Sequence, residues 1–268
     1  SASLNHASLI DGIRLARSQG TVEVSLFDHH DLKTLEASLQ TSSIKHKLIV
    51  IDGVFSMDGD IAPIKELLKL ANAHDALLII DDAHGFGVLG SSGYGALEDQ
   101  GLSSDRIIYI GTLGKAAGLA GAFVCAHDLM IEWMIQKARP YIYSTASSPA
   151  IAFALLESLR IIEGEIGQVL RSTLKTNISQ WKKHSQFETL KKLDSDTAIQ
   201  PIVVGSNEAA LQLAKNLDEL GYWIPAIRPP TVPKNMARLR MTLSAAHTPD
   251  EIDTLSDTLI KLESQLSH

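Results

Sequence analysis

Two short polar segments combine residue types that could do chemistry together. Asp81-Asp82-Ala83-His84-Gly85 and Gly111-Thr112-Leu113-Gly114-Lys115 each follow a run of apolar residues. A carboxylate at the end of a buried strand needs a cationic or hydrogen-bonding partner to stay ionised, and a protonated ring nitrogen is such a partner. A lysine among small residues, kept from bulk water, becomes a usable amine nucleophile. Asp81 and Lys115 are therefore candidates for acid–base and covalent chemistry.

Each segment also has a simpler interpretation. The two aspartates could cap a helix or make structural hydrogen bonds, and Lys115 could be a surface lysine after a turn. A divalent metal site from Asp81, Asp82 and His84 is disfavoured because no further set of His, Asp or Glu at ligand spacing accompanies it. We therefore expect no metal. A Walker phosphate-binding loop is excluded, because the glycine spacing and the alanine after Lys115 do not match its pattern.

The two segments fit one cofactor when they are taken together. In open α/β sheets ligands bind beyond the carboxyl ends of the strands, which makes residues 52–60, 81–84 and 111–115 the candidates for a site. A carboxylate for a pyridinium nitrogen and a lysine for a Schiff base are the pair that pyridoxal phosphate requires. Thr112 and exposed backbone N–H groups near it could hold the phosphate. This combination favours a pyridoxal-phosphate site.

Alternating strand and helix patterns predict the fold that would position these residues. Continuous apolar runs at residues 47–51, 77–80, 106–110 and 120–126 are typical of strands buried on both faces of a mostly parallel sheet. Residues 21–27 alternate and are rich in β-branched side chains, so they predict a further strand. A helix is expected to begin after Pro63, because Ile64, Leu67, Leu68 and Ala71 form one apolar stripe there. Further helices are expected at residues 32–39, capped by Asp31, and at 129–138 and 149–162. The last of these can continue through 166–182, with a break near Gly164 and Gly167.

The remainder of the chain predicts a second, smaller α+β domain. Strands are expected at residues 199–204 and 238–243, and helices at 208–220, closed by Gly221, and at 249–262. We place a large cofactor-binding domain at residues 1–168 and a small C-terminal domain at 169–268.

Composition narrows the class of protein. The chain of 268 residues has 24 basic against 31 acidic side chains, a balance that argues against nucleic acid as a partner. The apolar runs are far shorter than the ~20 residues that a membrane-spanning helix needs. With one cysteine, Cys125, and no signal-peptide pattern, we expect a cytoplasmic protein.

Five motifs, in order along essentially the whole chain, resemble those of one family. They are Leu4-Asn5-His6-Ala7-Ser8-Leu9-Ile10-Asp11-Gly12, Gly53-Val54-Phe55-Ser56-Met57-Asp58-Gly59-Asp60, the two segments above and Tyr143-Ser144-Thr145. On these motifs the chain resembles the α-oxoamine synthases, fold-type I pyridoxal-phosphate enzymes that condense an amino acid with an acyl thioester and release carbon dioxide. The resemblance implies an α/β fold with a mostly parallel central sheet flanked by helices and a smaller α+β C-terminal domain.

One branch of that family is most similar. Ile227-Arg228-Pro229-Pro230-Thr231-Val232-Pro233 and Ala237-Arg238-Leu239-Arg240 look most like the branch that joins L-alanine to a pimeloyl thioester in biotin synthesis. The glycine-using branch typically has Ser-His-Ala in place of Ala83-His84-Gly85. The resemblance thus implies pyridoxal 5'-phosphate as cofactor, L-alanine and pimeloyl-CoA or pimeloyl acyl carrier protein as substrates, and a homodimer with a shared active site.

The resemblance also implies a role for each site residue. Lys115 resembles the Schiff-base lysine, Asp81 the partner of the ring nitrogen, and His6 the residue stacked on the pyridine face. His84 and Ser56 would bond the phenolic oxygen, Thr112 the phosphate, Thr145 the phosphate of the partner subunit, and Arg228 the amino acid carboxylate. Arg238 and Arg240 alternate on an expected strand and are interpreted as structural.

Two departures from the family pattern bear on activity. The family has a further N-terminal region with a glycine-rich phosphate loop, and this sequence starts after it. Ser147-Ser148 replaces the apolar-Pro pair that is common in the family, and the resemblance implies that this changes the acyl channel. The alternatives to the alanine-using enzyme are another α-oxoamine synthase, such as a glycine C-acetyltransferase, and a catalytically silent fragment.

Overall fold

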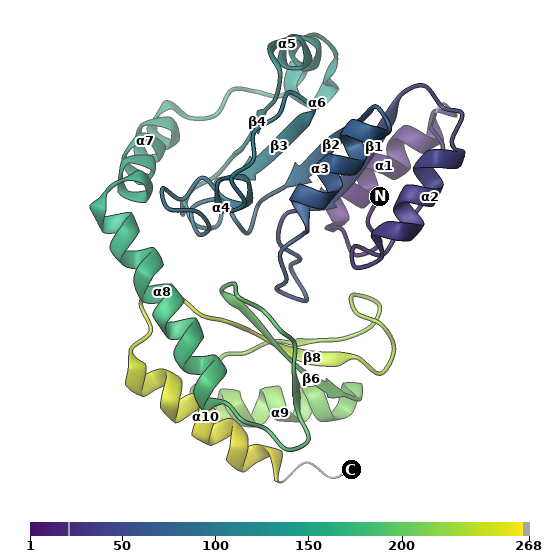
Figure 1. Cartoon of the computed structure of the whole chain (residues 1–268). Helices are drawn as coiled ribbons and strands as arrows, with labels where there is room; N and C mark the ends of the chain where they lie inside the picture. Colours follow the sequence, from purple (N-terminus) through teal and green to yellow (C-terminus); the bar gives the residue numbers. More distant parts are fainter. Residues whose placement is uncertain (21, 265–268) are drawn as a thin grey trace. The chain divides into compact units, whose positions relative to one another are not determined.

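The computed structural model describes residues 1–20 and 22–264, and these form two compact units (Figure 1). The first unit comprises Ser1–Phe55 and Ala62–Gln168, and the second comprises Ser56–Ile61 together with the chain from Val169 onward. The short segment Ser56–Ile61 thus belongs to the second unit although it lies within the first in sequence.

The first unit is built on a four-stranded sheet with the order β1-β2-β3-β4. β1 (Lys47–Asp52), β2 (Ala76–Asp81) and β3 (Ile107–Thr112) run parallel, and β4 (Ala122–Cys125) is antiparallel to β3 (Figure 1). The mostly parallel sheet predicted from the apolar runs is therefore confirmed. Because parallel strands share a direction, the carboxyl ends of β1, β2 and β3 meet at one edge.

Two of the expected strands differ from their predictions. Residues 120–126 were expected to be buried on both faces, but β4 is antiparallel, lies last in the sheet and is largely exposed. Residues 22–26 form no strand, and Phe27 makes only an isolated bridge with Ala2; residue 21 lies outside the described residues. An alternating sequence forms a strand only where a neighbour completes its hydrogen bonds, and one bridge does not do so.

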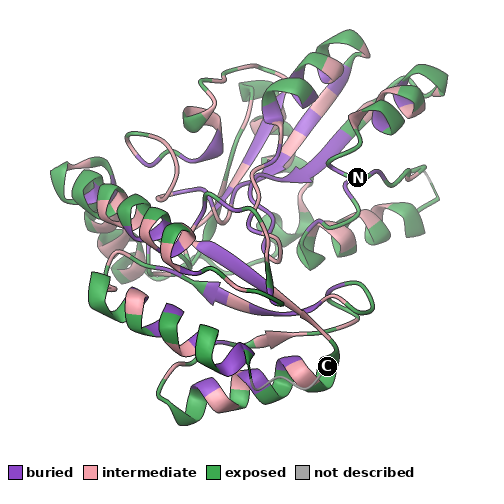
Figure 2. Ribbon diagram, turned by 60° about the horizontal axis from the view of Figure 1, so that its bottom comes forward, coloured by how far each residue is buried: buried purple, intermediate pink, exposed green. Residues whose placement is uncertain are grey.

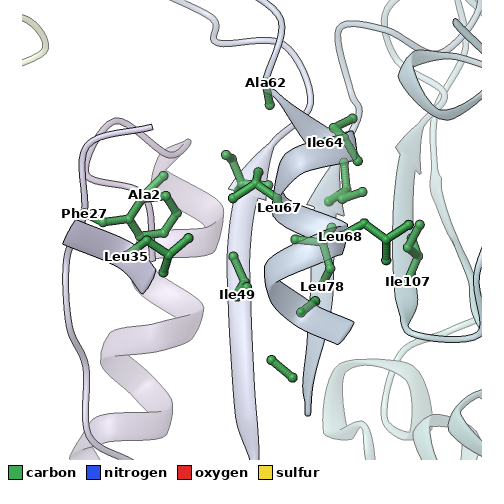
Figure 3. Packing of buried hydrophobic residues seen from close by; sticks show 14 of the residues in the cluster. Ala2, Phe27, Leu35, Ile49, Ala62, Ile64, Leu67, Leu68, Leu78 and Ile107 are labelled. Carbon is green, nitrogen blue, oxygen red and sulfur yellow. The ribbon is translucent and has the colours of Figure 1, made fainter. Parts of the chain in front are cut away.

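Helix α3 (Ile64–Ala73) shows why the sheet is well packed. Its four apolar residues Ile64, Leu67, Leu68 and Ala71 are all buried, as the stripe predicts. They meet Ile49 of β1 and Leu78 of β2 in one continuous core (Figure 3). Fully burying one such side chain stabilises the fold by roughly 1.5–3 kcal/mol.

The other helices of the first unit differ in how well the sequence predicts them. α2 (Leu32–Thr41) begins where expected, and the side chain of Asp31 accepts the Thr34 N–H as its cap. α5 (Asp128–Lys137) and α7 (Pro149–Glu163) are also confirmed. The short helices α4 (Ala96–Asp99) and α6 (Arg139–Ile142) were not predicted. α1 (Ala7–Ser18) was not predicted. Its apolar residues Leu9, Ile13 and Ala16 recur at helical spacing, but they are only half-buried and none of the helix's residues is buried.

The second unit packs helices against an antiparallel sheet of order β5-β6-β8-β7. Its strands are β5 (Lys191–Lys192), β6 (Ile199–Gly205), β7 (Ala226–Ile227) and β8 (Ala237–Thr242). Its helices are α9 (Asn207–Glu219), α10 (Pro249–Glu263) and, from Val169 onward, α8 (Glu165–His184). The predicted helical break falls at Gly164, while Gly167 lies inside α8. In each helix, the side that faces the core around Trp181 is buried and the opposite side is exposed (Figure 2).

Buried hydrogen bonds attach the segment Ser56–Ile61 to this second unit. The hydroxyls of Ser195 and Thr197 both donate to the carbonyl of Gly59, at 2.8 and 2.9 Å. The buried Arg238 guanidinium donates to the Met57 carbonyl at 3.0 Å and pairs with Asp58. Arg238 therefore has the structural role that its place on a strand indicated.

None of the helices in the described part of the chain combines the length and the apolar character needed to cross a membrane.

Gly59 provides a test of this attachment. Its φ of +75° strains any residue with a Cβ, and an added Cβ would lie 2.6 Å from Ser195 Oγ and closer still to the Ile199 carbonyl. Gly221 has a similar φ of +89° with open space around it, so it is the matched control. We expect Gly221→Ala to lower the free energy of unfolding by about 1–2 kcal/mol and Gly59→Ala to lower it by about 1–3 kcal/mol more.

Urea unfolding followed by tryptophan fluorescence measures this difference. Trp181 is fully buried in the second unit, whereas Trp133 and Trp223 are 62% and 87% exposed, so the signal reports mainly on the second unit. Equal losses in the two variants would show that the contacts of Gly59 contribute nothing beyond its backbone conformation.

Candidate functional site

The carboxyl ends of β1 and β2 bring two aspartates side by side. Asp52 and Asp81 are in register as the last residues of these strands, and both are buried. The N–H of Gly53 donates to the Asp81 carbonyl at 2.7 Å, which extends the pairing one residue beyond the strand end. Asp81 thus lies at the strand terminus that the sequence predicted for it.

A third aspartate, Asp82, fixes the loop that carries His84. Its buried carboxylate accepts the N–H of Ala96 at 2.7 Å and the hydroxyl of Tyr109 at 2.8 Å. Burial, more than any other cause, raises the pKa of Asp82 to about 6. A Cβ on Gly53 would lie 2.6 Å from this carboxylate, so the small residue is required there. We assign Asp82 a structural role.

His84 lies in the first turn after Asp81. The N–H of Ala83 donates to Asp81 Oδ1 at 3.1 Å, and the N–H groups of Gly85 and Phe86 return to the carbonyl of Asp82. These bonds make a tight turn in which His84 is half-buried. The turn that follows Asp81 therefore fixes the backbone from which the His84 side chain projects.

Lys115 lies in a compact loop that begins at the end of β3. Thr112 is the last residue of that strand, and the N–H of Leu113 donates to the Gly121 carbonyl at 2.9 Å, which closes the loop. The Lys115 carbonyl accepts the N–H of Gly118 at 3.0 Å. The expectation that Lys115 is kept from bulk water is wrong for this chain, because the residue is exposed; its side chain is therefore accessible to a ligand at this edge.

The buried carboxylate of Asp52 interacts electrostatically with both Asp81 and Lys115. The pKa of Asp52 is raised to about 7, chiefly by burial and to a smaller extent by the negative charge of the nearby Asp81. The backbone N–H of His6 and the positive charges of Lys115 and His29 act in the opposite direction on the same pKa. Asp81 and Lys115 therefore both lie within electrostatic range of one carboxylate.

His6 reaches this edge through its backbone. Its N–H donates to both oxygens of Asp52, at 3.0 and 3.2 Å. Its ring caps α1, because Nδ1 accepts the N–H of Ser8 at 3.3 Å. Sequence reasoning placed His6 in the site but gave no role to Asp52, although Asp52 ends an apolar run just as Asp81 does.

The geometry of this edge does not test the roles predicted for Thr145, Ser56 and Arg228. Thr145 lies in the exposed segment between α6 and α7. Ser56 is buried and Arg228 is exposed, and both residues belong to the second unit. Their roles beside Lys115 and Asp81 stay predictions.

Potential metal ligands gather elsewhere. Within residues 1–20 and 22–264, Asp28, His29 and His30 can bring ligand atoms within 4.8 Å of one another, and Asp81, Asp82 and His84 form no such group. His29 also stacks on Phe55, with ring centroids 3.8 Å apart. A stacked histidine beside two exposed neighbours does not by itself indicate a metal site.

Several proteins related in sequence carry the name 8-amino-7-oxononanoate synthase. The chain is 54% identical to 8-amino-7-oxononanoate synthase of Janthinobacterium sp. (strain Marseille) over 99% of its length, and 52% identical to that of Bordetella petrii over all of it. It covers 66% and 67% of those two relatives, so it spans about two thirds of their length. The resemblance to the α-oxoamine synthases is thus confirmed by relatives that carry such a name.

Solved structures and a family model agree with this relationship. Serine palmitoyltransferase from S. paucimobilis, solved with a bound PLP–myriocin aldimine, is similar with a TM-score of 0.87 at 28% identity, over 98% of this chain and 65% of that one. An 8-amino-7-oxononanoate synthase from Francisella tularensis is similar with a TM-score of 0.82 at 32% identity, over 98% and 74%. The predicted fold-type I architecture is confirmed by these neighbours. The family model "Aminotransferase class I and II" matches residues 1–259, and the chain belongs to that family.

Proposed function

We propose that this protein is a pyridoxal-phosphate-dependent acyltransferase that condenses L-alanine with a pimeloyl thioester to give 8-amino-7-oxononanoate in biotin biosynthesis. One observation carries the proposal. Asp81 ends β2, Lys115 follows the end of the neighbouring parallel strand β3, and the charges of both residues act on the pKa of the buried Asp52 carboxylate. The relatives at 52–56% identity, named for this activity, support the choice of reaction.

The residues at the sheet edge fit this cofactor. Asp81 is a buried carboxylate, suited to hold a proton on a ring nitrogen, and Lys115 is an exposed amine on a closed glycine-containing loop. Thr112, at the start of that loop, offers a hydroxyl to a phosphate. When bound, pyridoxal phosphate supplies an electron sink for a carbanion at the α carbon of the substrate.

Each residue of the chain then has a distinct task. The Lys115 amine takes the proton from the α carbon of L-alanine as a general base. The carboxylate of Asp81 keeps a proton on the ring nitrogen, and burial strengthens that ion pair because little water competes for it. The Arg228 guanidinium binds the carboxylate of L-alanine through a bidentate pair of hydrogen bonds.

The remaining residues complete the proposed site. With the cofactor bound, His6 would stack on the ring, His84 and Ser56 would donate to its phenolic oxygen, and Thr112 would bind the phosphate. Thr145 binds the phosphate of a partner subunit in a homodimer, and its position on an exposed segment supports such a reach. The acyl group arrives on coenzyme A or acyl carrier protein, and the enzyme works in the cytoplasm.

Replacement of Lys115 tests the cofactor. We expect the protein mixed with pyridoxal phosphate and reduced with borohydride to carry the cofactor on the peptide that contains Lys115. Lys115→Ala should lose this label and all turnover, because both the covalent attachment and the base disappear. Lys137→Ala, which removes an exposed lysine on α5, is the matched control and should keep the label. A label of unchanged position and yield in Lys115→Ala would contradict the assignment.

Replacement of Arg228 tests the substrate. A charge-assisted hydrogen bond contributes roughly 1.5–3 kcal/mol, so Arg228→Ala should raise the KM for L-alanine at least about tenfold. Lys234→Ala removes an exposed cation a few residues away and serves as control. Steady-state rates with pimeloyl-CoA and L-alanine, glycine or L-serine measure both effects. An unchanged KM in Arg228→Ala would refute that role, and a preference for glycine or serine would indicate a different α-oxoamine synthase.

A further inference from the structure

We propose that Asn5 and Asp52 form a clip that holds His6 at the carboxyl edge of the sheet, which makes Asp52 a positioning residue of the site. This inference rests on the proposed function, since it concerns the residue proposed to stack on the cofactor ring. The hydrogen bonds of the clip join residues 45 to 47 positions apart in sequence, all within the first unit.

The first half of the clip is the side-chain amide of Asn5. Asn5 is buried, its Nδ2 donates to the Val50 carbonyl at 2.8 Å, and its Oδ1 accepts the N–H of Asp52 at 3.0 Å. Both of these backbone groups belong to β1, which lies at the end of the strand order. A side-chain amide has the donor and the acceptor of a peptide group, so Asn5 satisfies backbone groups that a neighbouring strand would otherwise pair.

The second half of the clip is the carboxylate of Asp52. It accepts the His6 N–H through both oxygens, and His6 follows Asn5 directly in the chain. The same β1 end therefore binds two consecutive residues, Asn5 by its side chain and His6 by its backbone. This arrangement fixes the backbone from which the imidazole projects.

The imidazole itself is also fixed. Nδ1 of His6 accepts the N–H of Ser8 and lies 2.8 Å from Ser8 Oγ. A nitrogen that accepts a backbone N–H carries no proton, so the neutral ring has its proton on Nε2. The start of α1 thus sets the tautomer of the ring, while Asp52 sets its position.

The clip depends on the ionisation of Asp52. An ionised carboxylate accepts with both oxygens and makes a charge-assisted bond, which protonation removes from one of them. The titratable groups that act on Asp52 are Asp81, which favours protonation, and Lys115 and His29, which oppose it. Because burial raises the pKa of Asp52 to about 7, the clip should weaken as the pH falls through this value.

Amide hydrogen exchange of His6 in the cofactor-free chain tests the clip directly. We expect the protection factor, corrected for intrinsic exchange, to fall as the pH is lowered from 8 to 5. In Asp52→Asn, which is isosteric and uncharged, it should be at least about tenfold lower at pH 8 and independent of pH. Asp11→Asn, an exposed change on α1, should match the unchanged protein. A protection factor that does not depend on pH in the unchanged protein, or that Asp52→Asn leaves intact, would overturn the proposal without any variant needing to be active.

Cofactor titration separates positioning from a direct effect. If Asp52 acts through His6, Asp52→Asn and His6→Ala each weaken pyridoxal phosphate binding, and the double variant binds no more weakly than His6→Ala alone. Additive losses would overturn the positioning role. Absence of binding by the unchanged protein would instead refute the proposed function, while the exchange experiment would still decide whether the clip exists.

Discussion

The burial of three carboxylates at one edge of a parallel sheet is the constraint on which this site depends. Asp52, Asp81 and Asp82 end β1 and β2, and water solvates none of them well. The raised pKa values of Asp52 and Asp82 mean that the folded protein binds protons that the unfolded chain has released. For Asp52 this holds between its ordinary pKa of 3.8 and about 7, so stability falls as the pH rises through that interval. Such a cost, on the order of a few kcal/mol, is typical of residues kept for a functional site rather than for folding.

Each of these carboxylates is tolerated by a different means. Asp82 receives a backbone N–H and a tyrosine hydroxyl, and these bonds turn it into the anchor of the following loop. Asp52 receives the backbone N–H of His6 and the field of Lys115. Asp81 is bonded within its own turn by the N–H of Ala83, and the proposed cofactor would supply the cation that such a buried carboxylate needs. The three neighbours in space thus divide into a loop anchor, a positioning group and a ligand-binding group.

Sequence periodicity predicts the parts of this fold whose side chains meet a core. The stripe of α3 and the apolar runs of β1, β2 and β3 were found for that reason, because burial imposes a repeat on the sequence. α1 was missed although Leu9, Ile13 and Ala16 recur at helical spacing, because this half-buried stripe lies among polar residues. β4 was misjudged because an apolar run does not reveal whether its strand lies inside the sheet or at its edge. Residues 22–26 show the converse, since a strand-like pattern forms no strand without a partner.

The site was predictable to the extent that its chemistry is local. Asp81 with His84, and Thr112 with Lys115, are short motifs at strand ends, and the topology of a parallel sheet brings such ends together. The link between Asn5 and Asp52 is different, because it exists only once the chain before α1 lies along β1. No spacing in the sequence encodes that contact, although an asparagine beside a proposed site histidine was visible from the start. The Asn5 amide and the Ala2 N–H together bind the Val50 carbonyl, so the chain before α1 takes the place of a neighbouring strand, and the residue that it brings to the carboxyl edge of the sheet is His6.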